Sequence, residues 1–346
     1  MLLERKLGRT GIDVAVLGLG CYQITEEFDV KQETASRILD YAMEKGITWY
    51  HTAAMYGYGE SEELVGRALM RHKENPKLHC ATQIGYFDKP VKEEYANTIK
   101  QTWAPYFTDP EHLMRALKRS MWLLRKDVLD VLAIHEPDWP QWQIDPETGT
   151  GACIDFLEEA KKEGLVKNIG LGGWDYHGLA QLCDTGKFDF VLCAGGISLL
   201  TKDIYKELIP ACKRHNVGVS LGGGFGQMTP YLVVKDRRWI ELLKTVDDEK
   251  FYNVSRKLER LYNICDETGM SITELAIRYI MNHEEIHTHV AGARELSHIQ
   301  QNLASAEKGP LPQDLFQELE DIQNSGQCPL VWDIRDVSRE LAKKLK

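Results

Sequence analysis

Hydrophobic residues along the chain form eight short runs of strand length, separated by segments with helical spacing. Each run is almost continuously apolar and rich in β-branched residues, as expected of parallel strands buried on both faces. The runs cover residues 14–20, 48–53, 78–85, 129–136, 166–173, 188–195, 217–223 and 286–293. This regular alternation predicts eight strand–helix units.

The segments between the runs repeat apolar residues every three or four positions. In residues 31–46, Ile38 and Ala42 fall on one helical face, and Gly46 supplies a C-terminal stop. Residues 152–164 repeat the same design. Helices with one apolar face are what a sheet of buried parallel strands needs as a cover.

Eight strand–helix units predict an α/β fold of the (β/α)8 class, the TIM barrel. A doubly wound sheet is the alternative, but the first run is not followed by the G-x-G-x-x-G turn of that fold. We expect a single barrel domain over residues 1–346. Within it, residues 1–13 are expected to form an N-terminal hairpin and residues 311–346 a helical tail.

Three long inserts follow predicted strands, at residues 86–108, 138–151 and 225–253. Segments that follow barrel strands lie at the C-terminal mouth, where the active sites of this fold are found. The inserts are rich in aromatic residues, which suits an organic substrate, although packing of the loops is the ordinary role of most such side chains. The candidate substrate contacts are Tyr22, Tyr86, Trp139 and Trp174.

Composition narrows the classes of function. The 346 residues are 43% hydrophobic and 27% charged, which excludes a disordered chain. A net charge of −10 argues against nucleic-acid binding, and no apolar run reaches membrane length. The chain starts without an apolar signal segment, and its eight cysteines form no C-x-x-C pair. We expect a cytoplasmic protein with a small-molecule substrate and no nucleic-acid or membrane partner, and the oligomeric state stays open.

Polar side chains suited to acid–base chemistry end three neighbouring predicted strands. His51 ends the second strand, and Tyr56 follows it closely. Gln83 and His135 end the third and fourth strands, so all four residues should meet at the barrel mouth. The two histidines with Gln83 or Glu136 offer an alternative metal site, but they lack the spacing of a ligand pair on one helix. We therefore predict acid–base chemistry and no metal.

Several segments together resemble the aldo-keto reductase family, and the resemblance covers almost the whole chain. The segment GITWYHTAAMYG, residues 46–57, is similar to the family's signature around its catalytic tyrosine, here Tyr56. Residues 119–135 resemble the stretch that carries the catalytic histidine, here His135. The other similar segments are residues 6–11, 17–20, 61–66, 164–170 and 292–302. The resemblance implies an NAD(P)-dependent carbonyl reductase with a tetrad of Tyr, Lys, Asp and His.

Two tetrad positions differ from the family. His51 stands at the aspartate position and Gln83 at the lysine position. A free tyrosine has a pKa of about 10, and proton exchange near neutrality needs a neighbouring cation to lower it. Gln83 carries no charge, and without the lysine a buried aspartate would be an unpaired charge, so the two changes are coherent. We favour a rebuilt relay, in which protonated His51 or His135 is the acid or supports Tyr56, over a site that has lost its chemistry.

The resemblance also identifies positions for a nicotinamide cofactor. The family's polar pair toward the nicotinamide amide corresponds to Gly172 and Gly173, and its stacking aromatic residue to Ile197. The glycine run after the seventh strand would bring backbone N–H groups close to phosphates. That run consists of Gly222, Gly223 and Gly224. The nicotinamide end therefore departs from the family, and cofactor binding is in doubt there.

The adenosine end resembles the family more closely. The spacing from Gly292 to Asn302 is retained, and Arg294 is suited to a 2′-phosphate, although Glu295 opposes it. NADP and NAD therefore both stay open. The candidate residues at this end are Arg294, His298, Gln301 and Asn302.

Three functions remain. The first is an NAD(P)-linked oxidoreductase acting on a carbonyl or hydroxyl group of a sugar or aromatic molecule, with Tyr56 and His51 as proton donors and His135 orienting the carbonyl. The second is a lyase or isomerase that uses the same residues without net hydride transfer. The third is a non-catalytic binding protein. We favour the first.

Overall fold

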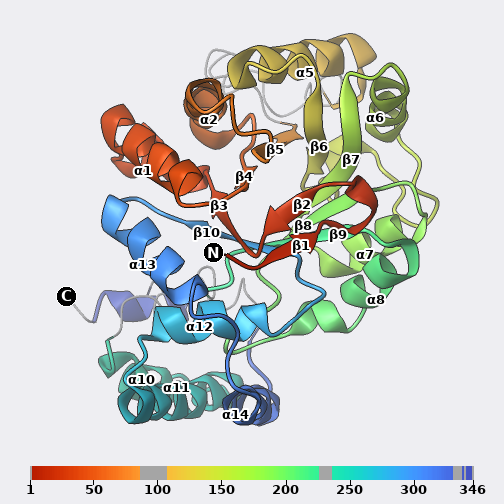
Figure 1. The fold of residues 1–346 in the computed structure, drawn as a ribbon. Coiled ribbons are helices and arrows are strands. Elements are labelled where there is room, and N and C mark those ends of the chain that lie inside the picture. The colour runs from red at the N-terminus through yellow and green to blue at the C-terminus, as the bar shows by residue number, and fades with distance from the viewer. Residues whose placement is uncertain (1, 86–106, 226–235, 330–336, 339, 345–346) are drawn as a thin grey trace.

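The computed structural model describes residues 2–85, 107–225, 236–329, 337–338 and 340–344. Within these residues, eight parallel strands close into a barrel in chain order, with the last strand pairing with the first. Helices surround the barrel (Figure 1). The strands are β3 (Leu17–Gly20), β4 (Trp49–His51), β5 (His79–Ile84), β6 (Leu129–His135), β7 (Val166–Gly173), β8 (Phe190–Ala194), β9 (Gly218–Gly222) and β10 (Thr288–Gly292). The predicted TIM barrel is confirmed.

The helices turn their apolar faces toward the strands, and none in the described part of the chain is long and apolar enough to cross a membrane. On α5, the Asp109 carboxylate accepts the Glu111 N–H and so caps the first turn. The helices are α1 (Gln32–Glu44), α2 (Glu60–Arg71), α5 (Pro110–Leu124), α6 (Ala152–Lys162), α7 (Tyr176–Asp184), α8 (Leu208–His215), α10 (Arg238–Lys244), α11 (Glu249–Thr268), α12 (Ile272–Met281), α13 (Leu296–Ala306) and α14 (Gln313–Asn324).

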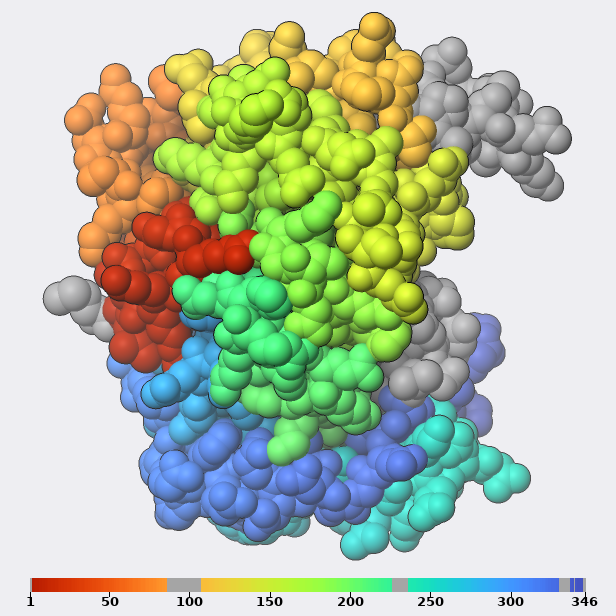
Figure 2. Space-filling view, turned by 90° about the vertical axis from the view of Figure 1, so that its right-hand side faces the viewer, coloured from red at the N-terminus to blue at the C-terminus, as the bar shows by residue number. Residues whose placement is uncertain are grey.

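An antiparallel hairpin of β1 (Glu4–Lys6) and β2 (Asp13–Ala15) precedes the barrel, as predicted. The first predicted run, residues 14–20, is wrong as a single strand because it spans both β2 and β3. The hydrophobic run is continuous in the sequence because both strands are buried. Val14 is buried at one end of the barrel interior, whereas Leu17 is buried against the helices. The hairpin thereby closes the end of the barrel opposite the mouth. Figure 2 shows this red segment at the left side of the molecule.

The third insert differs from its prediction as a mouth loop. Residues 236–253 contain α10 and the start of α11, where the Asp248 carboxylate accepts the Lys250 N–H. The buried residues Trp239, Ile240 and Leu243 have helical spacing. The prediction missed this helix because it counted Trp239 among the aromatic residues of a mouth loop. Residues 86–106 of the first insert lie outside the described residues.

Two large aromatic side chains fill the middle of the barrel. The rings of Trp49 and Phe190 lie 5.5 Å apart, and both side chains are fully buried. On β7, Gly170 gives Phe190 its space, because a Cβ there would lie 2.7 Å from the Phe190 carbonyl oxygen. Phe190 in turn lies against the His51 ring at 6.1 Å in a nearly parallel arrangement. These rings form the floor beneath the barrel mouth.

Gly66 marks the closest approach of α2 to α5, because a Cβ there would overlap the Leu123 carbonyl oxygen. We predict that Gly66→Ala destabilises the protein by about 2 kcal/mol through overpacking, although alanine is the better helix former. Guanidinium unfolding measures this. Gly269→Ala is the control, since its Cβ meets nothing within 4 Å and only the φ of 71° is strained, which costs about 1 kcal/mol. Equal effects of the two variants would contradict the overpacking argument.

Candidate active site

Three neighbouring strand ends bring the four predicted catalytic residues together at the barrel mouth. The Gln83 Nε2 lies 3.5 Å from the Tyr56 Oη, to which it donates. The Tyr56 and His135 rings meet edge to face, with 5.8 Å between their centroids. His51 lies deeper, is 2% exposed and stacks on Phe190. A hydroxyl, a carboxamide and two imidazoles therefore line one small region.

A strained turn holds Tyr56 in place. Gly57, Tyr58 and Gly59 all have positive φ, which is uncommon for a bulky residue such as Tyr58 (φ 54°). The Arg119 Nη2 of α5 donates to the Tyr58 carbonyl oxygen at 3.0 Å. Backbone strain of this kind persists only where the surroundings impose it, and Arg119 supplies that restraint.

The four candidate catalytic side chains are uncharged near pH 7, and the neighbouring Glu136 carboxylate adds to the rise of the Tyr56 pKa. Burial lowers the pKa of His51 and of His135 to about 3, so both imidazoles are uncharged. Burial raises the pKa of Tyr56 above its ordinary value, and the hydrogen bond from Gln83 opposes this only in part. The structure therefore differs from the expectation of a protonated histidine, because no carboxylate lies close enough to offset the desolvation of either ring in the described part of the site.

Two of these side chains carry buried polar atoms without hydrogen-bond partners among the described residues. They are both ring nitrogens of His51 and the Oε1 of Gln83. Buried polar atoms are almost always paired in native proteins, so unpaired ones at a barrel mouth indicate places for a ligand or an ordered water.

Gln83 and Gly172 fit each other across the mouth. A Cβ on Gly172 would overlap the Gln83 Oε1, so the carboxamide occupies the space of a side chain at position 172. The two positions that the resemblance marks as departures from the family, 83 and 172, therefore pack directly against each other. Sequence reasoning missed this link, because it treated the ends of β5 and β7 independently.

The candidate substrate contacts are distributed around the mouth. The Tyr22 ring lies 4.8 Å from the Tyr56 ring. Trp174 lies against the end of β8, where its Cζ3 would be 3.8 Å from a Cβ on Gly195. Tyr86 lies outside the described residues. The contacts of Tyr22 and Trp174 suit residues that border a substrate.

The end of β8 also carries an aromatic residue that the sequence reasoning missed. The Tyr176 Oη donates to the Ala194 carbonyl oxygen at 2.9 Å, and its ring lies over Gly196. Ile197, by contrast, is fully buried and presents no surface to a ligand. Trp174 and Tyr176 therefore supply the aromatic surface at the end of β8. Their spacing of two residues directly after β7 is the sequence pattern that could have indicated this.

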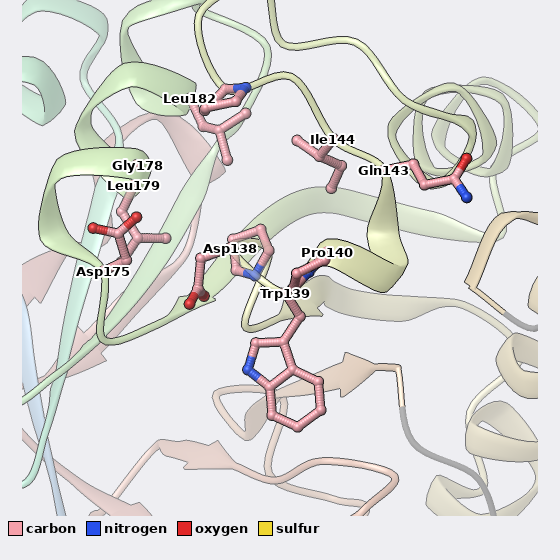
Figure 3. A pocket seen from close by; sticks show the side chains of 11 residues that line it. Asp138, Trp139, Pro140, Gln143, Ile144, Asp175, Gly178, Leu179 and Leu182 are labelled. Atoms are coloured by element: carbon pink, nitrogen blue, oxygen red, sulfur yellow. The ribbon is translucent and has the colours of Figure 1, made fainter. Parts of the chain in front are cut away.

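Trp139 belongs to a separate hollow on the flank of the mouth (Figure 3). The cavity measures about 200 Å³ and lies between the loop after β6 and helix α7. Figure 3 shows the Trp139 ring pointing away from Ile144 and Leu182, which line the other side. None of the four candidate catalytic residues lines this cavity. The cavity therefore does not connect Trp139 with them.

The adenosine-end candidates surround the start of α13. The exposed Arg294 donates through Nη2 to the Phe28 carbonyl oxygen, and its backbone N–H donates to the His298 Nδ1. Gln301 is exposed and Asn302 is buried on the same helix. The Glu295 side chain makes no capping hydrogen bond to the described residues of α13, so N–H groups at this helix start remain for an anion. These residues fit a phosphate-bearing cofactor.

The three glycines at the end of β9 have different roles. Gly222 is the last residue of the strand, and a Cβ there would meet nothing nearer than 3.8 Å, so the space beside it is free of described atoms. Gly223 needs its freedom for a φ of 67°. A Cβ on Gly224 would lie 2.5 Å from Ile280 and 2.7 Å from His289, so this glycine serves packing.

Solved structures share this architecture. An aldo-keto reductase from Bacillus halodurans, in its holo form, superposes with a TM-score of 0.68 at 21% identity, covering 94% of this chain and 98% of that one. An aldo/keto reductase from Klebsiella pneumoniae in complex with NADP and acetate gives a TM-score of 0.65 at 18% identity, covering 93% and 96%. At these identities the likeness shows the fold.

Comparisons of the sequence with known proteins show the family. A pyridoxal 4-dehydrogenase from Microbacterium luteolum is 24% identical over 340 residues, covering 91% of this chain and 96% of the relative. A D-threo-aldose 1-dehydrogenase from a Pseudomonas species is 24% identical over 331 residues with the same coverage. The sequence model of the aldo/keto reductase family matches residues 16–324. Because this match spans most of the barrel, the chain belongs to the aldo/keto reductase family of oxidoreductases.

Proposed function

We propose that this protein is an NAD(P)-linked oxidoreductase that interconverts a carbonyl and an alcohol on a small molecule. The observation that carries the proposal is the setting of Tyr56: its hydroxyl accepts from Gln83 at 3.5 Å, and its ring meets the His135 ring edge to face. Relatives named as dehydrogenases and a related structure in complex with NADP support this chemistry.

Tyr56 acts as the proton donor in the reducing direction. Because Gln83 donates to the Tyr56 oxygen, the phenolic proton stays available for the oxygen of a substrate carbonyl. His135 is neutral and offers a ring N–H to the same oxygen, which fixes its position. The bound nicotinamide would supply or accept the hydride, and we propose that Gly222, Arg294 and Asn302 would hold that cofactor.

His51 has a supporting role in this mechanism. Its pKa of about 3 makes it a poor acid near neutrality, and its ring lies beneath the mouth on Phe190. Its two unpartnered nitrogens are suited to an ordered water under the substrate. Oxidation of an alcohol requires ionised Tyr56, which burial disfavours, so the rate of oxidation should be low at neutral pH.

A lyase or isomerase is the second candidate, and the nicotinamide end favours it. Gly172 and Gly173 offer no polar side chain there, and Ile197 is fully buried. Proton transfer by Tyr56 and His135 is sufficient for such a reaction. Calorimetric titration with NADPH and NADH separates the two functions: micromolar binding supports hydride transfer, and no binding of either supports the second.

We predict that Tyr56→Phe lowers the rate of carbonyl reduction at least 100-fold, because it removes the proton donor. Binding of NADPH or NADH, measured by calorimetry, should change less than twofold. Tyr41→Phe on α1 is the control for loss of a hydroxyl elsewhere. Full activity in Tyr56→Phe would exclude this residue as the acid.

The pH dependence follows from these uncharged side chains. The histidine pKa values of about 3 lie below the range of about pH 5 to 9, and the Tyr56 pKa lies above it, so the kcat/KM of reduction should be flat there. Oxidation should rise with pH, because it needs ionised tyrosine. In the double variant His51→Asp with Gln83→Lys, the new ammonium lowers the Tyr56 pKa and moves this rise to lower pH. A bell-shaped wild-type profile centred near pH 6.5 would instead require a titrating histidine.

Arg119 should act through the turn that carries Tyr56. We predict that Arg119→Met lowers kcat about tenfold while KM and cofactor affinity change little, because the Tyr58 carbonyl loses its donor. Arg119→Lys keeps a donor on a long side chain and should restore part of the rate. Steady-state kinetics of the two variants measure this, and equal losses of kcat in both would argue against a positioning role for this hydrogen bond.

A further inference from the structure

Lys257 of α11 is buried and has its amino group enclosed by the protein. Its side chain is 2% exposed, and its Nζ donates to the carbonyl oxygens of Gln323 at 2.6 Å and Gly326 at 2.7 Å. Its partners among the described residues are carbonyl oxygens and a thiol, and no carboxylate is among them. Because a buried charge is costly unless it is hydrogen-bonded, these carbonyls stabilise the ammonium. One amino group thus holds the end of α14 and the segment after it against α11.

The third side of this amino group faces a thiol. The Lys257 Nζ lies 3.4 Å from the Cys328 Sγ and 3.5 Å from the Leu200 carbonyl oxygen, which follows β8. An ammonium has three N–H groups, and the two short hydrogen bonds to carbonyl oxygens occupy two of them. The third N–H has only the two longer contacts. When its proton leaves, the nitrogen lone pair lies on the side of the sulfur.

Cys328 is one of two cysteines that solvent reaches. Six of the eight cysteines are buried, whereas Cys265 and Cys328 are partly exposed. Burial raises the pKa of the Cys328 thiol, and the neighbouring Lys257 opposes this rise. A small oxidant therefore has access to this sulfur, and the thiolate that reacts with the oxidant forms beside a cation. The pair combines a reachable sulfur with a nitrogen that is held in contact with it.

We propose that Lys257 and Cys328 form a modification site, at which hydrogen peroxide joins the two side chains through a covalent S–N bond. In the first step the Cys328 thiolate attacks the peroxide, the O–O bond breaks, and the products are a sulfenic acid and hydroxide. The sulfur is oxidised and the peroxide is reduced. In the second step the neutral Lys257 nitrogen attacks the sulfur, the S–O bond breaks, and hydroxide leaves as water with a proton from the nitrogen. Overall, thiol, amine and hydrogen peroxide give a sulfenamide and two molecules of water.

The geometry of the pair suits this condensation. The separation of 3.4 Å between Nζ and Sγ is that of reacting atoms in a near-attack arrangement. The carbonyls of Gln323 and Gly326 keep the nitrogen at this place, so it is the nearest nucleophile to a sulfenic acid on Cys328. The two residues are 71 positions apart in the sequence, so the bond would fasten the segment after α14 to α11 and close a long loop. The proposal does not depend on the chemistry at the barrel mouth.

The test is a peptide map of the whole protein after mild oxidation. The folded protein is treated with hydrogen peroxide at about pH 8.5, near the ordinary pKa of a thiol, its free thiols are blocked with N-ethylmaleimide, and it is digested with trypsin without reduction. We expect the peptides that contain residues 257 and 328 to be linked, about 2 Da lighter than their sum, with no cleavage after Lys257. Dithiothreitol, which reduces the S–N bond to thiol and amine, should restore both peptides. Oxidised Cys328 beside an unmodified Lys257 would overturn the proposal.

Two variants and a matched control identify the atoms that react. Lys257→Arg keeps a cation with N–H donors but has no amine, so Cys328 should be oxidised without a cross-link. Cys328→Ser should give no cross-link, whereas Cys265→Ser removes the other partly exposed thiol and should cross-link as wild type does. A cross-link at residue 257 that survives in Cys328→Ser, or one that is lost in Cys265→Ser, would contradict the pairing. If Lys257→Arg fails to fold, the wild-type map and Cys328→Ser still decide the outcome, because they identify both ends of the bond.

Discussion

The space between β5 and β7 at the barrel mouth holds one carboxamide, and the rest of the site depends on that constraint. Gly172 has no side chain, so Gln83 extends over β7 with its oxygen where a Cβ would be. This position directs the Gln83 nitrogen to Tyr56 and leaves the oxygen unpaired. The backbone of one strand thus determines which hydrogen-bonding group another strand turns toward Tyr56.

The floor of the barrel explains why the titratable side chains of the site are uncharged. Trp49 and Phe190 fill the interior below the mouth and exclude water from the His51 ring. Desolvation without a compensating carboxylate lowers the pKa of His51 and of His135, and it raises that of Tyr56. The proposed chemistry therefore relies on hydrogen bonds of fixed direction instead of a cation beside Tyr56.

Periodicity predicted the barrel because parallel strands buried on both faces read as apolar runs, and motif spacing placed Tyr56, Gln83 and His135 at one mouth. Contacts between distant strands escaped prediction. Neither the fit of Gln83 to Gly172 nor the position of Trp174 beside Gly195 has a local signal, because each depends on how the barrel closes. The protonation of the histidines also depends on burial, which spacing alone does not give. The hairpin end at Ala15 was missed because Val14 and Leu17 are both buried, though in different cores.

The side chains at positions 51 and 83 are energetically coupled, whereas the glycine at 172 is linked to Gln83 by packing alone. An aspartate at 51 with Gln83 would be a carboxylate buried on Phe190 without a cation, which is costly. A lysine at 83 with His51 can lose its proton and remain neutral, so this combination is the less costly intermediate. Gly172 has no side chain, so it leaves space for the Gln83 carboxamide. The same space is available to a lysine at position 83. Of the two mixed pairs, lysine with histidine is therefore less costly to bury at these positions than aspartate with glutamine.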